Sequence, residues 1–237
     1  MTTPAESIEA LEFERKFMIP RSRCEAAVSC LDAFCRRDPS YSAGIVSSIY
    51  FDTPRLRLLQ EKEDSTLYKT KVRLRWYEDL GAGPIGRSFL EIKSRVGLRR
   101  AKRRYPVELE AAQLSTAALT DPRILAALEN LDQDPTVATL GLRPVLVVRY
   151  QRRRWIDPVT GARISLDRSI SVPSTNPRIL PHTSFVRLPA VILEIKNSSG
   201  AIPPNLHFLR ALKAEPCSFS KYFECYRMLT TSQIEAA

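Results

Sequence analysis

Apolar and polar residues alternate along much of this chain with the two-residue period of a β-strand. The segment KTKVRLRW, residues 69–76, is the strongest example, because one face of such a strand carries four cations and the other face three apolar residues. Neighbouring cations on that face lie roughly 7 Å apart and repel each other by about 1 to 2 kcal/mol before salt screening. The pattern therefore predicts an anionic partner for this face. Its cations are Lys69, Lys71, Arg73 and Arg75.

The same alternation predicts seven or eight strands, whose short connections favour antiparallel pairing. The predicted strands are 11–19, 44–53, 67–77, 88–95, 100–110, 143–155, 162–170 and 190–196. Apolar residues at helical spacing predict short helices at 21–37, 54–62, 122–131, 204–213 and 220–230. We therefore expect an α+β protein, a closed or nearly closed antiparallel β-barrel flanked by short α-helices. It forms one domain over residues 1–237, with its core at about 11–229.

Charged residues share one face in most of these predicted strands, opposite a mostly apolar face. In a barrel, these charges either face solvent around an apolar interior or line a polar tunnel that helices cover on the outside. Many cations interrupted by a few carboxylates favour the tunnel, because a polyphosphate chain with a divalent metal needs both kinds of group. Besides the cations of 69–75, the residues concerned are Glu12, Glu14, Lys16, Glu91, Lys93, Arg95, Arg100, Lys102, Arg104, Arg163, Ser165, Asp167, Glu194 and Lys196.

Composition narrows the possible partners and the compartment. The chain has 36 Lys plus Arg against 26 Asp plus Glu, and the net charge of +10 is compatible with a nucleic acid, a membrane surface or a phosphorylated small molecule. Binding to nucleic acid is the weaker interpretation, since no helix-turn-helix, zinc-finger or RNA-recognition signature is present. Five cysteines without CxxC spacing indicate reduced thiols. Without an apolar signal segment or membrane span, we expect a cytoplasmic protein.

An ordered series of motifs resembles a known family. The run EFERK, residues 12–16, matches the ExExK signature of the CYTH superfamily, the triphosphate tunnel metalloenzymes, and FERKF is similar to its polyphosphate-polymerase branch, the VTC domain. ExExK alone is a weak signal, and the order of the whole set, which spans residues 11–226, carries the resemblance. The further motifs are SSIYFDTP (47–54), KVRLRWY (71–77), LEIK (90–93), YQR (150–152), RISLD (163–167), ILEIK (192–196) and FSKY (219–222).

The resemblance implies an antiparallel β tunnel that transfers the terminal phosphate of ATP to a growing polyphosphate chain with Mn²⁺ or Mg²⁺. No covalent nucleophile is needed, because positioning and charge neutralisation can supply most of the catalysis. The implied catalytic residues are Arg73, Arg75, Lys93, Arg152 and Lys221. The implied substrate-binding residues are Lys16, Lys71, Arg163 and Lys196, together with the less securely placed Lys102. The implied metal ligand is Glu194, assisted by Glu12 and Glu14.

Some of these residues also have a purely structural interpretation. Asp52 and Asp167 can orient neighbouring arginines or cap turns instead of taking part in catalysis. Glu91 can pair with Lys93 or Lys71 instead of binding metal. Trp76, Tyr77 and Tyr150 are expected to be packing residues. Both kinds of interpretation stay open at the level of sequence.

Other functions also fit the predicted tunnel. The same site could hydrolyse tripolyphosphate or a nucleoside triphosphate, since water as acceptor is a small change in geometry. It could also bind polyphosphate without turnover. The eukaryotic members of the family carry an inositol-phosphate-sensing extension and membrane spans, and their absence from the sequence favours a free-standing domain. We expect ATP and inorganic polyphosphate as partners, and neither nucleic acid nor a membrane.

Overall fold

Eleven antiparallel strands form one sheet in the computed structural model, which describes residues 13–97, 99–131, 134, 136–181 and 185–234. The strand order is β11-β1-β10-β8-β7-β3-β4-β5-β6, while β2 pairs with β7 and β9 with β8. The long strands are β1 (Phe13–Ile19), β3 (Ala43–Asp52), β4 (Tyr68–Asp79), β5 (Gly83–Val96), β6 (Arg99–Glu110), β7 (Arg143–Ile156), β8 (Arg163–Thr175) and β10 (Val191–Asn197). The two-residue strands are β2 (Arg36–Arg37), β9 (Val186–Arg187) and β11 (Glu215–Pro216).

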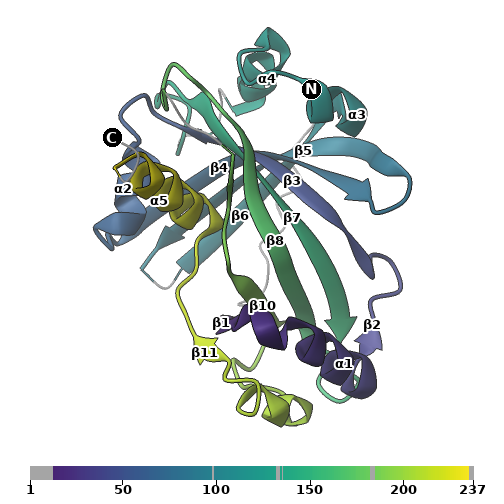
Figure 1. Cartoon of the computed structure of the whole chain (residues 1–237). Coiled ribbons are helices and arrows are strands. Elements are labelled where there is room, and N and C mark those ends of the chain that lie inside the picture. The colour runs from purple at the N-terminus through teal and green to yellow at the C-terminus, as the bar shows by residue number, and fades with distance from the viewer. Residues whose placement is uncertain (1–12, 98, 132–133, 135, 182–184, 235–237) are drawn as a thin grey trace.

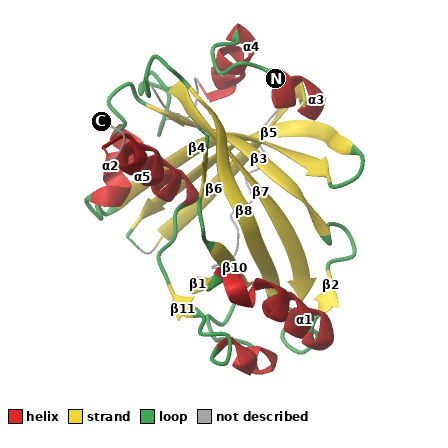
Figure 2. Cartoon of the chain, in the orientation of Figure 1, coloured by secondary structure: helices red, strands yellow, loops and turns green. Residues whose placement is uncertain are grey.

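The prediction of an antiparallel sheet with short helices is confirmed, and eight long strands agree with the seven or eight expected. The sheet is strongly twisted, so that its long strands cross one another in projection (Figure 2). It is not a closed barrel, because β6 and β11 are its two ends and no strand pairing joins them in the part of the chain that the structure describes.

Most of the helices cover the outer, apolar side of the sheet, whereas α2 and α5 pack against its inner face (Figure 1). At one end of the molecule, α1 and η3 pack Leu31 and Leu209 against Trp155 of β7. At the other end, α3, α4 and η2 cover the apolar faces of β4 and β5, including Leu74 and Leu90. The helices are η1 (Arg21–Arg23), α1 (Cys24–Phe34), α2 (Arg57–Glu63), α3 (Ala111–Thr116), α4 (Pro122–Ala126), η2 (Ala127–Leu131), η3 (Pro204–Leu209) and α5 (Lys221–Ile234).

Two predicted helices differ from those observed. The helix expected over 21–37 ends at Phe34, because Arg36 and Arg37 leave it to form β2 against β7. The segment 204–213 forms only a 3-10 helix at Pro204–Leu209. In both cases the apolar spacing is right and a tertiary contact or a proline-rich start decides the local geometry.

The start of α2 also differs from the prediction. Instead of beginning at Pro54, the helix follows Leu56, whose φ of 56° is left-handed. The buried carboxylate of Asp52 accepts hydrogen bonds from the backbone N–H groups of Leu58 at 2.8 Å and Leu59 at 3.0 Å, and from the hydroxyl of Tyr222 at 2.9 Å. Asp52 therefore ties β3 to α2 and α5, which confirms its structural interpretation.

All five cysteines are free thiols, as expected. Across the described ranges, no helix combines the length and the apolar character needed to cross a membrane.

Replacing Asp52 should destabilise the fold. In Asp52→Ala, the buried N–H groups of Leu58 and Leu59 and the Tyr222 hydroxyl lose their acceptor, which should lower the free energy of unfolding by at least about 2 kcal/mol. Urea denaturation measures this change. The control is Asp64→Ala at the exposed end of α2, and an equal effect of both substitutions would contradict the assignment.

Candidate active site

Strands next to the two ends of the sheet approach each other through charged side chains. Lys93 of β5 and Glu14 of β1 lie far apart in the strand order, yet their Nζ and Oε2 atoms are 2.9 Å apart. The charged faces of these strands therefore face each other across the inside of a curved sheet. This observation decides between the two arrangements left open by the sequence: the charges are inside, and α1, α3, α4, η2 and η3 cover the apolar faces outside.

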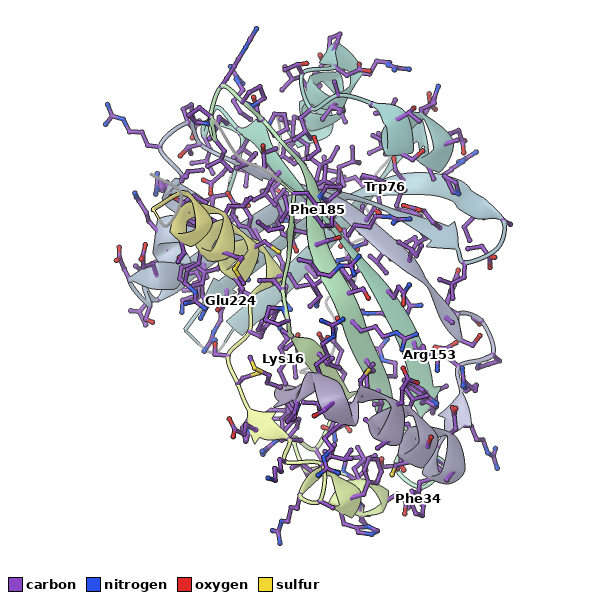
Figure 3. The ribbon with its side chains drawn as sticks, viewed as in Figure 1. Lys16, Phe34, Trp76, Arg153, Phe185 and Glu224 are labelled. Atoms are coloured by element: carbon purple, nitrogen blue, oxygen red, sulfur yellow. The ribbon has the colours of Figure 1, made fainter. Side chains whose placement is uncertain are left out.

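We call this set of inward-facing charges the polar interior. Figure 3 draws the side chains on the ribbon, with Lys16, one member of this set, labelled. The set holds eight cations and four carboxylates, so the positive charges are in clear excess. Its members are Glu14, Lys16, Lys71, Arg73, Arg75, Glu91, Lys93, Arg152, Asp167, Glu194, Lys196 and Lys221.

Two carboxylates from adjacent strands form the first group. In the pairing of β1 with β10, Glu14 lies opposite Lys196 and Lys16 lies opposite Glu194, so all four side chains share one face. Glu14 contacts Lys16 at 2.8 Å, and Glu194 contacts Lys196 at 3.3 Å. Burial and the charge of Glu194 raise the pKa of Glu14, but the ammonium groups of Lys16, Lys93 and Lys196 outweigh them and lower it to about 2. Both carboxylates stay ionised although they repel each other.

Asp167 organises a second group. It is fully buried and binds the guanidinium of Arg152 through two parallel hydrogen bonds of 2.6 and 2.7 Å. The same carboxylate lies 2.6 Å from the ammonium of Lys221, the first residue of α5. Burial opposes the ionised form of Asp167, yet the nearby cations hold its pKa below the ordinary value. Asp167 thus orients an arginine, as its structural interpretation predicted, and also draws Lys221 inside.

Glu91 forms the third group, surrounded by arginines. Its Oε2 lies 2.7 Å from Nη2 of Arg73 and 3.6 Å from Nη1 of Arg75, and its Oε1 lies 3.5 Å from Nε of Arg104. Burial raises the pKa of Glu91, but Arg73 and Arg75 lower it far more. Glu91 is therefore an internal counterion, although its partners are arginines and not the Lys93 or Lys71 considered from the sequence. Two hydroxyl groups of β3 complete this third group: Tyr50 accepts a hydrogen bond from Arg73, and Ser48 accepts one from Arg75.

The segment before α5 covers one side of the polar interior. Lys16 donates to the carbonyl oxygen of Phe219 at 3.0 Å, and Lys71 donates to Oγ of Ser220 at 2.9 Å. In the part of the chain that the structure describes, Lys71 forms no ion pair with a carboxylate, and its charged neighbours include Lys16. Burial, followed by the charges of Lys16, Lys93, Arg73 and Lys62, lowers the pKa of Lys71 to about 7.

The structure brings together most residues that the sequence singled out. Lys102 lies opposite Lys93 on β6, and its charge helps to lower the pKa of Glu91. Arg163 lies opposite Lys196 on β8, with its side chain exposed. Glu12 lies outside the described residues.

Sequence reasoning missed some neighbours of these residues. Ser220 and Tyr50 carry no charge, so their role appears only when α5 and β3 are in place. Arg104 was recognisable as a charge on the inner face of its strand, in alternation with Lys102, but no motif of the resemblance pointed to it. Tyr150 is buried as expected, and its hydroxyl also accepts from Arg75.

The carboxylates can supply part of a metal site. No cluster of three or more His, Cys, Asp or Glu with metal-binding geometry occurs among the residues that the structure describes. Glu14 and Glu194, however, are two ionised carboxylates on one face whose repulsion a divalent cation would relieve. Mg²⁺ is commonly held by one or two carboxylates while substrate phosphates and water complete its shell, so this pair fits such an ion.

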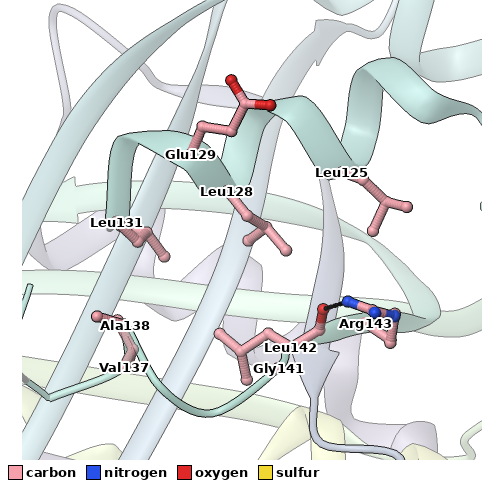
Figure 4. Close-up of a pocket in the computed structure, with 9 residues that line it drawn as sticks. All are labelled: Leu125, Leu128, Glu129, Leu131, Val137, Ala138, Gly141, Leu142 and Arg143. Atoms are coloured by element: carbon pink, nitrogen blue, oxygen red, sulfur yellow. Dashed lines mark hydrogen bonds between the residues drawn. The ribbon is translucent and has the colours of Figure 1, made fainter. Parts of the chain in front are cut away.

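A hollow elsewhere on the surface has different chemistry. It lies between η2, the end of α4 and the loop before β7, and its lining is mostly leucine and other apolar residues, with Glu129 and Arg143 at the rim (Figure 4). Arg143 donates to the carbonyl oxygen of Leu142. This hollow lacks the converging cations of the polar interior and takes no part in the site.

These features define a curved antiparallel sheet with an excess of cations on its inner face, an arrangement that suits a multiply charged anion. The model of the VTC domain family matches residues 11–230, so the chain belongs to the VTC domain family. The resemblance noted in the sequence is thereby confirmed. No curated protein sequence matches the chain.

Solved structures support the same fold. HpAC1 from Hippeastrum, a candidate adenylyl cyclase with a dominant triphosphatase activity, is 16% identical with a TM-score of 0.52, and the match covers 91% of this chain and 95% of that chain. A candidate adenylate cyclase from Bacillus halodurans is 13% identical with a TM-score of 0.52, and the match covers 88% of this chain and 93% of that chain. At such identities the likeness concerns the fold.

Tripolyphosphate should stabilise the protein strongly. A polyanion that binds only the folded state relieves repulsion in the polar interior, and at a hundred times its Kd adds about 2.7 kcal/mol, or roughly 5 to 10 °C in Tm. Thermal unfolding with tripolyphosphate, against chloride at equal ionic strength, measures the shift. Arg73→Ala should reduce it, and an unchanged Tm of the wild type would contradict an anion site.

Lys71 should make anion binding depend on pH near neutrality. Because the pKa of Lys71 is lowered to about 7, its positive charge is present below pH 7 and lost as the pH rises above it. The affinity for tripolyphosphate should therefore fall between pH 6 and pH 8.5 more steeply in the wild type than in Lys71→Arg, whose guanidinium stays charged. Calorimetric titrations at several pH values test this. Parallel pH profiles would show that Lys71 does not titrate in this range.

Proposed function

We propose that this protein is a polyphosphate polymerase that transfers the terminal phosphate of ATP to the end of an inorganic polyphosphate chain. The observation that carries the proposal is the excess of inward-facing cations over carboxylates in the polar interior, gathered from six strands and α5. Such an excess is unfavourable in the free protein and becomes favourable when a chain of phosphates supplies the missing negative charge. Membership of the VTC domain family supports the same class of substrate.

The arginines and lysines would position the reacting phosphates. Arg73 and Arg75 lie two residues apart on one face of β4, so their guanidinium groups can bind neighbouring phosphates of one chain. Lys93, Arg152 and Lys221 approach from other sides of the polar interior. Charge developing on the transferred phosphoryl group would then meet cations from several directions, without any covalent intermediate. An oxygen of the chain end forms the new bond to phosphorus, and ADP leaves.

Glu194 and Glu14 would hold a divalent cation, Mn²⁺ or Mg²⁺, and Glu12 is proposed to assist them. When bound, the ion would neutralise phosphate oxygens during transfer. Lys196 and Lys16, which now neutralise these carboxylates, would be released to contact phosphate. Lys102 and Arg163 extend the substrate-binding set on β6 and β8.

The length of the cationic track favours polymer synthesis. Lys69 and Arg75 are six residues apart on β4, which is roughly 20 Å of extended strand. Lys69 lies opposite Arg95 and Lys71 opposite Lys93, so cations accompany this track on the neighbouring strand. A track of this length exceeds the span of three linked phosphate groups, and it can hold a chain end together with the triphosphate of ATP.

A triphosphatase is the second candidate. The triphosphatase activity stated for the Hippeastrum protein, whose fold is similar, makes hydrolysis in the same site a real alternative. Water would replace the chain end as acceptor, and the same cations would stabilise the transition state. The two activities differ in product, because hydrolysis releases orthophosphate and makes no polymer.

The decisive experiment is incubation of pure protein with ATP and Mn²⁺, followed by gel electrophoresis for polyphosphate. The wild type should give a ladder, while Arg73→Ala and Glu194→Ala should lose at least about a hundredfold of the activity. Arg73→Ala removes a cation that would contact the reacting phosphates, and Glu194→Ala removes a ligand of the proposed metal ion. Arg123→Ala, which removes an exposed arginine paired with Asp121 at α4, is the matched control and should keep full activity.

The products separate the candidate functions. Orthophosphate without a ladder would establish the triphosphatase instead. Normal polyphosphate binding with neither product, unchanged in Glu194→Ala, would leave a non-catalytic binding protein.

A further inference from the structure

The two ends of the polar interior differ in chemistry. Along the inner face of β4, lysines come first and Tyr77 comes last. The antiparallel neighbour β5 has its cation at the same end as the lysines and its aromatic residue at the other end, since Arg95 lies opposite Lys69 and Phe89 lies opposite Arg75. We call the region of Tyr77, Phe89 and Arg104 the aromatic end.

Arg104 is held flat at the aromatic end. Its guanidinium lies 3.6 Å from the ring centroid of Phe89, as a stacked cation–π pair. The edge of the group is fixed by Nη2, which donates to the hydroxyl of Tyr77 at 3.4 Å, and by Nε, which lies 3.5 Å from Oε1 of Glu91. The side chain is still 38% exposed. Because Phe89 covers one face of the guanidinium, the opposite face is the one available to a ligand.

Such a group suits a planar aromatic ligand. A guanidinium plane stacks on nucleobases, and an aromatic ring behind it keeps the plane in place. Arg104 shares the carboxylate of Glu91 with Arg73 and Arg75, so a ligand on its open face lies next to the proposed phosphate track. A nucleoside triphosphate has this combination of a planar base and an adjoining polyanion.

We propose that the open face of Arg104, supported by Phe89, binds the nucleobase of ATP at the aromatic end. This inference rests on the proposed use of ATP and adds a site for the part of the nucleotide that phosphate-binding cations do not recognise. The triphosphate then runs along Arg75 and Arg73 towards Glu194, and the polymer extends towards Lys69 and Arg95. Arg104 discriminates between a nucleotide and an inorganic triphosphate of similar charge.

Calorimetric binding of two ligands, both with Mg²⁺, tests the site. The probes are the non-hydrolysable nucleotide AMP-PNP, which has the base, and inorganic tripolyphosphate, which lacks it. Arg104→Lys keeps the charge but loses the plane, and Phe89→Leu removes the support. Both substitutions should lower the affinity for AMP-PNP roughly tenfold and leave the affinity for tripolyphosphate within about twofold of the wild-type value. Unchanged tripolyphosphate binding also shows that each variant is folded.

The matched control is Arg103→Lys, one residue away on the opposite face of β6, where Arg103 pairs with Asp134 at 2.8 Å. This substitution should change the affinity for neither ligand. Equal weakening of both ligands by Arg104→Lys, or no weakening of AMP-PNP, would overturn the base site. If Arg73→Ala abolishes binding of both ligands while Arg104→Lys changes neither, only the base site fails. If the wild type binds neither ligand, the proposed function fails with it.

Discussion

Repulsion among the cations of the polar interior is the constraint on which the rest of this structure depends. Each of these cations has exchanged part of its hydration for the inside of a sheet, where repulsion is less screened than in water. Four carboxylates offset much of it, and each of them contacts at least two cations: Glu14, Glu91, Asp167 and Glu194. Their ionised state is maintained against burial by these same cations, so neither sign of charge is stable here without the other.

These counterions also shape the fold. Glu14 joins Lys93 across the gap between the ends of the sheet, which backbone pairing does not close in the described residues. Asp167 joins β7 and β8 to the first residue of α5 through Arg152 and Lys221. A site assembled in this way couples the position of α5 to the charge inside. Binding of a polyanion would therefore affect both the cationic side chains and the position of α5.

Much of the site was visible in the sequence, because strand alternation fixes which residues share a face. The cations of 69–75 and the pair Glu194 and Lys196 needed only the two-residue period and a choice of side. That choice could not be made locally, since it depends on which face the helices cover. The contact of Lys93 with Glu14 settles it, and it joins residues 79 positions apart.

Other features depend on tertiary contacts that leave no local signal. The late start of α2 follows from Asp52 reaching two backbone N–H groups and Tyr222, a residue 170 positions away. Lys221 has the sequence context of a solvated helical lysine, and only Asp167 explains its inward position. Arg104 resembles its neighbours in a basic segment until the ring of Phe89 is seen beneath it. In each case a short local pattern predicts the helix or strand, and a contact with a residue distant in the sequence determines the role of the side chain.

The balance of charge finally explains why this interior is suited to a substrate and not merely to stability. A fully neutralised set would gain nothing from a phosphate chain, because every displaced carboxylate would cost as much as the new contact contributes. An excess of cations leaves room for an anion without displacing all internal partners, and Lys71, whose neighbours are mostly positive, is the clearest case. In the proposed function, the free protein gives up some stability so that bound phosphates, rather than its own side chains, complete the electrostatic balance.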